Sequence, residues 1–273
     1  MQVPGGKEMT IPHDHYLKFV ENSVLEETLF FHNRGTYTVD KLTGHTSTLH
    51  HLQGSELERM TGNELPLDII HTPTMETKLQ PPDRLHPLTR NDSCEHFNMG
   101  SMPFELVKQL LTPLLKKRDS HYGRGYPSGG ALYPVEVFCY DLGRRVTDWP
   151  LESRLLHLLP SSRCFEAHAT NVDDTKLINA LTPPCFTLGT PAIAIVYCIY
   201  LPKTIFKYRY RGYRLALMEA GSMYMLVDLK CKELNLSNRV WSGFTDHQLT
   251  CGLALNPTLF LPACIQYIGP RNE

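Results

Sequence analysis

Apolar residues recur at helical spacing in three segments of the chain. The first covers residues 14–31, the second residues 101–115, and the third residues 213–234. Side chains three or four positions apart lie on one face of a helix, so this pattern predicts three amphipathic helices. Gly35 supplies a stop signal just beyond the first helix, and Pro113 should kink or end the second near its C-terminus.

Other apolar runs have the composition of strands. Residues 192–200 form a continuous, β-branched run that predicts a buried strand, and residues 135–140 and 263–268 predict two more. From residue 101 onwards the order is helix, strand, strand, long helix, strand, with long connections. That order favours an α+β fold over regular alternation of strands and helices.

The N-terminal part of the chain differs from the rest. Residues 36–98 are rich in Thr, His, Pro and Gly and show weak periodicity, which indicates irregular structure. We therefore divide the 273 residues into an N-terminal region, 1–78, and a main domain, 79–273.

Composition and charge exclude several classes of partner and ligand. The formal net charge is -1, so no nucleic acid or anionic membrane surface is expected as a partner. No run approaches the length of a membrane span, and the first residues do not resemble a signal peptide. None of the eight cysteines forms a Cys-x-x-Cys pair, and no metal site is expected. These features predict a reduced, cytoplasmic protein.

A turn-rich loop covers residues 124–134 and contains the sequence Pro127-Ser128-Gly129-Gly130. Adjacent glycines allow positive φ angles and close approach of a ligand to the backbone. The exposed amides and the Ser128 hydroxyl can bind anionic or carbonyl oxygens, and Arg124 can pair with a phosphate. From these residues alone, a plain glycine-rich turn is the favoured interpretation. The loop lacks the spacing of a Walker loop or a dinucleotide fingerprint.

The residues from Arg124 to Glu136, Arg-x-Tyr-Pro-Ser-Gly-Gly-Ala-Leu-Tyr-Pro-x-Glu, resemble the signature of the SagB/McbC-type dehydrogenases, members of the nitroreductase-like flavoprotein superfamily. Blocks at residues 206–224 and 238–246 resemble the same family, as does the shorter block at residues 31–35. The resemblance implies an α+β nitroreductase-like fold, a mixed sheet flanked by helices. It also implies a homodimer with FMN sites between the subunits and helix 213–234 at the dimer interface.

The family oxidises thiazolines and oxazolines in ribosomal peptides to thiazoles and oxazoles, as in microcin maturation. The resemblance therefore implies a precursor peptide as substrate, with molecular oxygen as the final electron acceptor. It further implies a complex with a YcaO-type cyclodehydratase and a zinc-bearing subunit that binds the leader peptide. Two rival functions stay open: a generic FMN reductase of small molecules, and a non-catalytic scaffold subunit of a cyclodehydratase complex.

Cations and tyrosines alternate in residues 207–214. Such a stretch can bind single-stranded nucleic acid or form salt bridges at the start of a helix. For Lys207 and Tyr208 the resemblance implies catalysis instead. Aromatising an azoline requires a base for the proton on the former Cα, together with a flavin for the hydride on the former Cβ. Nearby cations should lower the pKa of both side chains and so favour their basic forms, and which of the two is the base stays open.

Candidate FMN contacts come from three parts of the sequence. Arg124 and the loop residues Pro127, Ser128, Gly129 and Gly130 are the first candidates. A second turn at Ser242 and Gly243, together with the C-terminal Arg271, completes the set implied by the resemblance.

Two departures from the family pattern affect the remaining candidates. Residues 90–97 retain one Arg and one Ser of the Arg-rich phosphate motif found in nitroreductases. Met225 and Leu226 replace a Gln-Asn pair, so any polar contact made by that pair is absent.

The assignment of Lys207 and Tyr208 leads to a first prediction. A double variant, Lys207→Ala with Tyr208→Phe, should retain yellow FMN but lose azole formation, because the base is absent while the flavin contacts remain. Flavin absorbance and the mass of the peptide product measure the two properties separately. Unchanged turnover in the double variant would remove the assignment.

Overall fold

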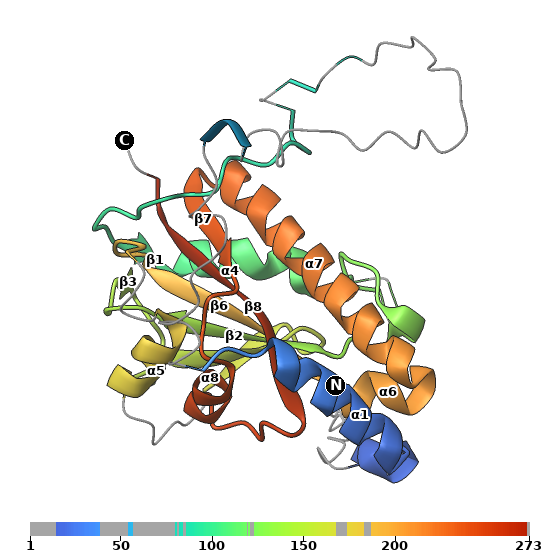
Figure 1. Cartoon of the computed structure of the whole chain (residues 1–273). Helices are drawn as coiled ribbons and strands as arrows, with labels where there is room; N and C mark the ends of the chain where they lie inside the picture. Colours follow the sequence, from blue (N-terminus) through green and yellow to red (C-terminus); the bar gives the residue numbers. More distant parts are fainter. Residues whose placement is uncertain are drawn as a thin grey trace, which may run out of the picture.

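The computed structural model describes residues 15–38, 54–56, 80, 82–83, 86–118, 120, 123–167, 174–182 and 187–271. Its main feature is a six-stranded sheet with helices on both faces (Figure 1). In spatial order the strands are β5 (Cys164–Ala167), β4 (Leu155–Leu159), β2 (Val135–Asp141), β6 (Ile193–Tyr200), β8 (Phe260–Pro270) and β7 (Leu236–Trp241). The three predicted strands are confirmed as β2, β6 and β8, the last being longer than expected.

The predicted α+β class is confirmed, with one correction to the sheet. Neighbouring strands of the six-stranded sheet pair antiparallel throughout, rather than forming a mixed sheet. Within the described ranges, parallel pairing of strands occurs between the two short strands β1 (Met102–Pro103) and β3 (Val146–Thr147). The sequence could not reveal this, because the direction of pairing depends on how the long connections run.

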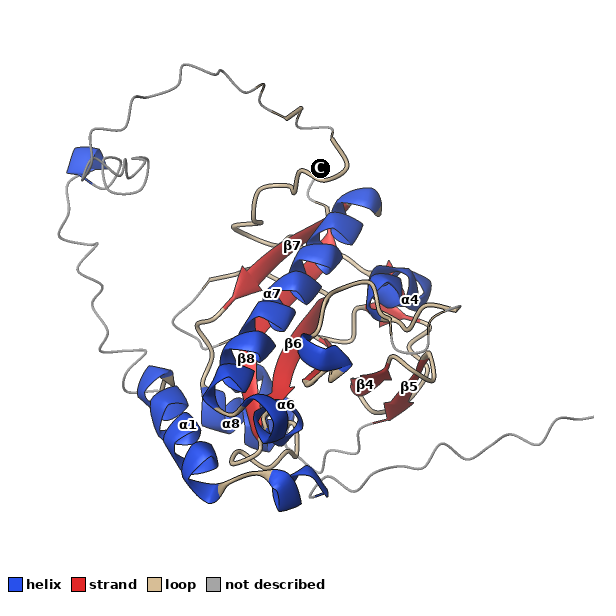
Figure 2. Cartoon of the chain, turned by 90° about the vertical axis from the view of Figure 1, so that its right-hand side faces the viewer, coloured by secondary structure: helices blue, strands red, loops and turns tan. Residues whose placement is uncertain are grey.

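Strand β6 is buried along its whole length and separates two hydrophobic cores. Side chains alternate between the faces of a strand, so Ile195 and Tyr197 contribute to different cores from Val196 and Cys198. Helices α4 (Phe104–Leu111) and α7 (Tyr210–Glu233) cover the first face, and α5 (Asp174–Leu181) and α8 (Asp246–Gly252) the second. Figure 2 shows α7 lying over one face of the sheet.

The predicted helices are present with shifted bounds. The first is divided into a 3₁₀ turn (His15–Phe19) and α1 (Asn22–Gly35), because the backbone is extended at Glu21. The second begins at Phe104, and a 3₁₀ turn at Thr112–Leu114 follows α4, which confirms the prediction for Pro113. The third begins at Tyr210, three residues earlier than expected.

A short helix, α6 (Pro202–Tyr208), precedes α7 and carries Lys207 and Tyr208. The chain reverses at Arg209, whose φ of 50° lies in the left-handed region that residues other than glycine rarely adopt. A Cβ on Gly212 would lie 2.8 Å from the carbonyl carbon and oxygen of Thr204, so the two helices approach at backbone distance. The Thr204 hydroxyl also donates a hydrogen bond of 3.2 Å to the Gly212 carbonyl.

Helix α1 packs against α6 and α7. Val24 is buried in the core of the first face, and His32 Nδ1 lies 3.0 Å from the Tyr213 hydroxyl. The predicted domain boundary between residues 78 and 79 lies outside the described residues. Among the helices that are described, none combines the length and apolar character needed to cross a membrane.

The close approach at Gly212 generates a prediction about stability. Gly212→Ala should lower the free energy of unfolding by about 1–3 kcal/mol, because the added methyl group meets rigid backbone. Gly221→Ala, in the same helix, is the control, since its Cβ would meet only Tyr224 at 3.8 Å. That control should be neutral or slightly stabilising. Urea unfolding monitored by circular dichroism measures both variants, and equal midpoints would contradict the proposed packing constraint.

Candidate functional site

The glycine-rich loop and the predicted catalytic pair lie side by side. A Cβ on Gly130 would lie 2.5 Å from the Tyr208 hydroxyl oxygen and 2.7 Å from Lys207 Nζ. Lys207 Nζ itself lies 5.3 Å from the centroid of the Tyr208 ring. Residues about 80 positions apart in the sequence are thus brought together by the pairing of β2 with β6, because the loop leads into β2 and α6 follows β6. A glycine is required at position 130 to admit these two polar atoms.

The backbone of this loop is strained. The φ angles are 62° at Gly130, 56° at Ala131 and 50° at Tyr133, all in the left-handed region. Ser128 Oγ accepts a hydrogen bond of 2.8 Å from the Tyr133 N–H, which fixes the turn from inside. Strained backbone persists only where surrounding contacts over-determine it, and it concentrates at functional sites.

Arg124 is held by aromatic residues of the same loop. Its guanidinium lies 4.1 Å from the centroid of the Tyr133 ring and donates a hydrogen bond of 2.9 Å to the Tyr126 hydroxyl. Its backbone N–H donates to the Tyr133 hydroxyl at 3.1 Å. These contacts stiffen the loop around Pro127, while the phosphate contact expected of Arg124 stays a prediction.

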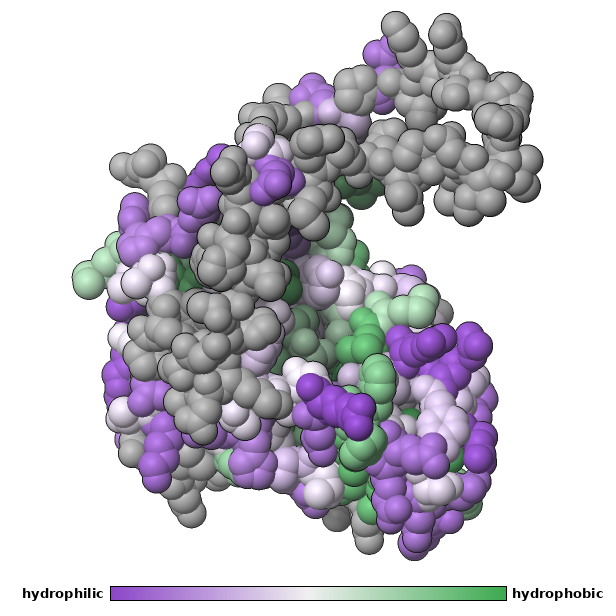
Figure 3. Space-filling view, viewed as in Figure 1, coloured by the Kyte–Doolittle hydropathy of each residue, from purple (hydrophilic) through white to green (hydrophobic). Residues whose placement is uncertain are grey.

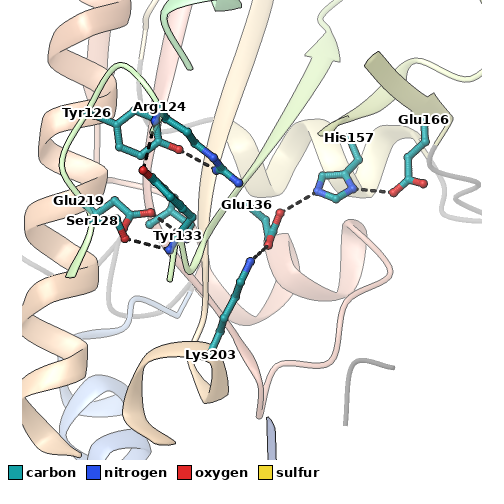
Figure 4. A network of polar contacts seen from close by, with 10 residues as sticks. Arg124, Tyr126, Ser128, Tyr133, Glu136, His157, Glu166, Lys203 and Glu219 are labelled. Carbon is teal, nitrogen blue, oxygen red and sulfur yellow. Dashed lines mark hydrogen bonds and ion pairs between the residues drawn. The ribbon is translucent and has the colours of Figure 1, made fainter. Parts of the chain in front are cut away.

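A network of charged side chains, formed by Glu136, His157, Glu166 and Lys203, joins the loop to α6 (Figure 4). Glu136, at the start of β2, lies 3.4 Å from Lys203 Nζ and 3.2 Å from His157 Nε2, and the other ring nitrogen of His157 lies 2.6 Å from Glu166. Burial alone would raise the pKa of Glu136, but Lys203 and His157 outweigh burial and lower this pKa to about 2. Burial disfavours the imidazolium of His157, yet the two carboxylates outweigh it and raise the pKa of His157. These contacts therefore favour the charged forms of Glu136 and His157.

The sequence alone did not identify this network of charged side chains as part of the site. Glu136 is the final residue of the family signature, which was a usable signal. His157 and Glu166 face each other across the pair β4 and β5, and register cannot be deduced from their sequence separation.

Arg271 lies elsewhere, at the wall of a cavity of about 910 Å³. The lining also contains Arg90, Lys232 and Asn238, together with the acidic residues Asp92 and Glu95. Arg90 Nε lies 2.8 Å from the buried carboxylate of Asp228, and another of its nitrogens donates to Ser93 Oγ at 3.0 Å. The single Arg and Ser that remain from the nitroreductase phosphate motif therefore contact each other beside this cavity.

Buried polar side chains connect the cavity wall to the centre of the sheet. The Asn238 amide donates to Asp228 at 3.3 Å, the Gln266 amide donates to Asn238 at 3.2 Å, and the Tyr197 hydroxyl donates to Gln266 at 2.8 Å. All four side chains are at most 2% exposed. Each of these buried polar groups has a hydrogen-bond partner, so together they form a rigid support for Asp228, which contacts Arg90.

Ser242 and Gly243 directly follow β7, the edge strand whose first residues line the same cavity. The short 3₁₀ turn at Gly129–Ala131 and strand β7 lie on opposite sides of α7 (Figures 1 and 2). Within one chain, the predicted cofactor contacts therefore form two groups, one at the loop and one along β7. No cluster of His, Cys, Asp or Glu suited to a metal ion occurs in the described part of the chain.

The face formed by α1 and α7 carries exposed apolar side chains (Figure 3). Phe30 and Phe31 of α1 are 62% and 69% exposed, and Met218 of α7 is 68% exposed. Contiguous exposed apolar side chains typically mark a surface that another protein covers.

Comparisons with known proteins relate the chain to a microcin-processing protein. It is 41% identical over 175 residues to the microcin B17-processing protein McbC of Escherichia coli, and this alignment spans 64% of each chain. A chain of the solved E. coli microcin synthetase McbBCD complex, with truncated pro-MccB17 bound, matches with a TM-score of 0.81 and 30% identity. That match covers 98% of this chain and 100% of the other.

A more distant likeness identifies the fold. A protein of Ralstonia eutropha described as a nitroreductase has a TM-score of 0.56 at 19% identity, with 71% of this chain and 89% of the other covered. The nitroreductase-like fold predicted from the sequence is thereby confirmed. No family model matches the chain.

The geometry at Gly130 generates a prediction about the site. Gly130→Ala should reduce turnover about 10²-fold, because the methyl group displaces Lys207 Nζ and the Tyr208 hydroxyl from their positions. Gly143→Ala is the matched control: its φ of 76° imposes a similar backbone cost, but its Cβ would meet only the side chain of Arg145. Both variants should lose similar thermal stability, and only Gly130→Ala should lose turnover. Equal turnover in the two variants would contradict the arrangement described.

Proposed function

Because the chain belongs to the family of the microcin synthetase subunit McbC, we propose that it is an FMN-dependent dehydrogenase that oxidises peptide azolines to azoles. The observation that supports this best is the position of two potential bases, Lys207 Nζ and the Tyr208 hydroxyl, against the backbone of Gly130. A strained, glycine-containing loop beside a proton acceptor suits a site where a flat cofactor and a reacting ring must approach closely.

Each reaction removes two hydrogens from one azoline ring. A base takes the acidic proton from the former Cα, and bound FMN supplies the acceptor for the hydride from the former Cβ. Lys207 and Tyr208 together provide the base. Lys207 Nζ lies 5.3 Å from the centroid of the Tyr208 ring, so the two side chains are close enough to act on the same substrate ring.

The cavity beside Arg90 and Arg271 fits the phosphate end of FMN. Guanidinium groups pair with phosphate through parallel hydrogen bonds, and the support from Asp228 keeps Arg90 at the cavity wall. Ser242 directly follows the same edge strand, four residues beyond Asn238, or about 13 Å at the usual rise per residue. Arg90 and Arg271 would hold the phosphate of FMN, and Ser242 and Gly243 would be available for further contacts with the cofactor.

Within one chain, α7 lies between the loop and β7 (Figure 2), so a flavin bound along β7 would not reach the loop of the same chain. We therefore propose a homodimer in which each flavin contacts β7 of one subunit and residues 127–130 of the other. The exposed apolar side chains of α1 and α7, including Leu217 at 41% and Met218 at 68%, supply a surface for the contact between subunits.

The solved relative also supports proposals for the substrate and for further partners. The solved relative is part of a synthetase complex with a truncated precursor bound, which supports a ribosomal precursor peptide as the substrate here. A YcaO-type cyclodehydratase would generate the azolines, and a zinc-bearing subunit would bind the leader peptide. These partners are proposals for this chain.

Mass spectrometry of the precursor tests the function. The precursor and the cyclodehydratase are co-expressed with or without this chain, and each azoline-to-azole step should remove about two mass units. A generic FMN reductase would leave the peptide mass unchanged, and its flavin would be bleached rapidly by a nicotinamide cofactor. A scaffold subunit would be purified colourless, or would support azole formation after its flavin was removed. Either result would overturn the proposal.

The same assay tests the shared site. Arg271→Ala and Gly130→Ala subunits should each form little azole alone, because each lacks one half of every site. When they are co-expressed, about a quarter of wild-type activity should return, since half of the dimers are mixed and each mixed dimer has one intact site. Failure to recover activity in mixed dimers of confirmed composition would contradict the shared site.

A further inference from the structure

Glu219 is a buried carboxyl group beneath the loop, on the side of α7 that faces the sheet. Glu219 as a whole is 2% exposed. Oε1 accepts a hydrogen bond of 3.3 Å from the Val135 N–H, just after the strained turn (Figure 4). Oε2 is equally buried and makes no hydrogen bond with any residue that the structure describes. The reaction proposed above assigns no role to this residue.

The charged groups around Glu219 are engaged with other partners. The nearby cations are Arg124 of the loop and Lys203 of α6. Arg124 contacts Tyr126 and the Tyr133 ring, whereas Lys203 pairs with Glu136. Within the described ranges no cation lies within ion-pair distance of Glu219, so an ionised carboxylate here would be buried without a counter-charge.

A carboxyl group in such surroundings is more stable when it is protonated. Burial raises the pKa of Glu219 to about 7, and the neighbouring Ser128 hydroxyl and Val135 N–H offset only part of that effect. Arg124 and Lys203 also lower this pKa, and the Tyr126 phenol interacts electrostatically with both Glu219 and Glu136. The neutral form therefore dominates below about pH 7.

We propose that Glu219 is a positioning residue for azoline oxidation, whose neutral form holds residues 128–135 so that Gly130 lies against Lys207 and Tyr208. The proposal rests on the function proposed above for that pair. Two hydrogen bonds bracket the strained turn: Ser128 Oγ fixes the Tyr133 N–H, and Glu219 fixes the Val135 N–H. Removing the second of them leaves one end of the strained segment unanchored.

Ionisation of Glu219 should loosen the loop. A carboxylate at Oε2 would require water or a displaced cation, and either would move the segment against which Lys207 and Tyr208 are placed. Turnover should therefore fall as the pH rises through about 7. The same titration affects stability: the folded chain keeps this proton to about pH 7, whereas an ordinary Glu carboxyl releases it near 4.5. The free energy of unfolding accordingly decreases as the pH rises between these values.

Two variants separate the charge of Glu219 from its hydrogen bond. Glu219→Gln keeps an acceptor for the Val135 N–H and is neutral at every pH. Glu219→Leu fills similar volume but accepts no hydrogen bond. Glu233→Gln is the matched control, because Glu233 lies on the same helix with its side chain 66% exposed.

Three measurements on the full-length protein follow from the proposal. As the pH rises from about 5 to about 9, kcat should fall in wild type but not in Glu219→Gln. Over the same rise in pH, the melting temperature of Glu219→Gln should increase relative to that of wild type. In Glu219→Leu, the amide hydrogens of residues 128–135 should exchange faster than in wild type. Its kcat should be about 10²-fold lower than that of wild type. Glu233→Gln should match wild type in all three.

The outcomes distinguish this inference from the proposed function. If wild type forms azoles but Glu219→Gln keeps the wild-type pH profile and relative melting temperature, the role of Glu219 is wrong and the function stands. Wild-type exchange and kcat in Glu219→Leu would overturn the inference in the same way. If wild type forms no azole, the proposed function fails, and the melting and exchange measurements, which need no turnover, decide the structural part of the inference alone.

Discussion

Burial of β6 on both faces is the constraint on which the rest of the structure depends. A strand with apolar side chains on both sides is stable only where helices cover the two faces of its sheet. Helix α7 covers one face and extends 24 residues, about 36 Å at the usual rise per residue. The helix therefore crosses the sheet from the loop beside α6 to the cavity beside Arg90. It supports both groups of candidate residues, and it also separates them.

The same packing explains how a strained loop is maintained. Residues 130–133 adopt backbone angles that cost free energy, and the contacts that hold them come from elements fixed by the core. Glu219 contacts the loop from α7, and Glu136 connects the start of β2 to Lys203 of α6. One carboxyl group lies where burial favours its neutral form, while the other lies where cations keep it ionised. Two residues of the same chemical type thus stabilise neighbouring segments in different ways.

Separation of the two groups by α7 supports the proposal that a dimer completes each site. In that arrangement the cofactor would be held by a rigid part of one subunit, since Arg90 is anchored through Asp228 to the centre of the sheet. The partner would contribute the loop with Lys207 and Tyr208. Assembly and catalytic competence would then depend on each other, because neither subunit carries a full set of contacts.

By itself, the sequence predicted the long helix, two further helices and the three strands β2, β6 and β8, and it identified the loop as a candidate part of the site. Helical spacing located most of α7, the apolar run identified β6, and the signature at residues 124–136 identified the loop. These features are local: burial of one helical face, or of both strand faces, leaves its mark in neighbouring residues. Only the tertiary structure decided that Glu219 lies beneath the loop and that His157 joins Glu136 to Glu166. It also placed Arg271 beside Asn235, just past the C-terminal end of α7, and Gly129 beside Leu215 near the N-terminal end. Such relations depend on strand register, antiparallel pairing and helix direction, which are set by contacts between residues far apart in the chain.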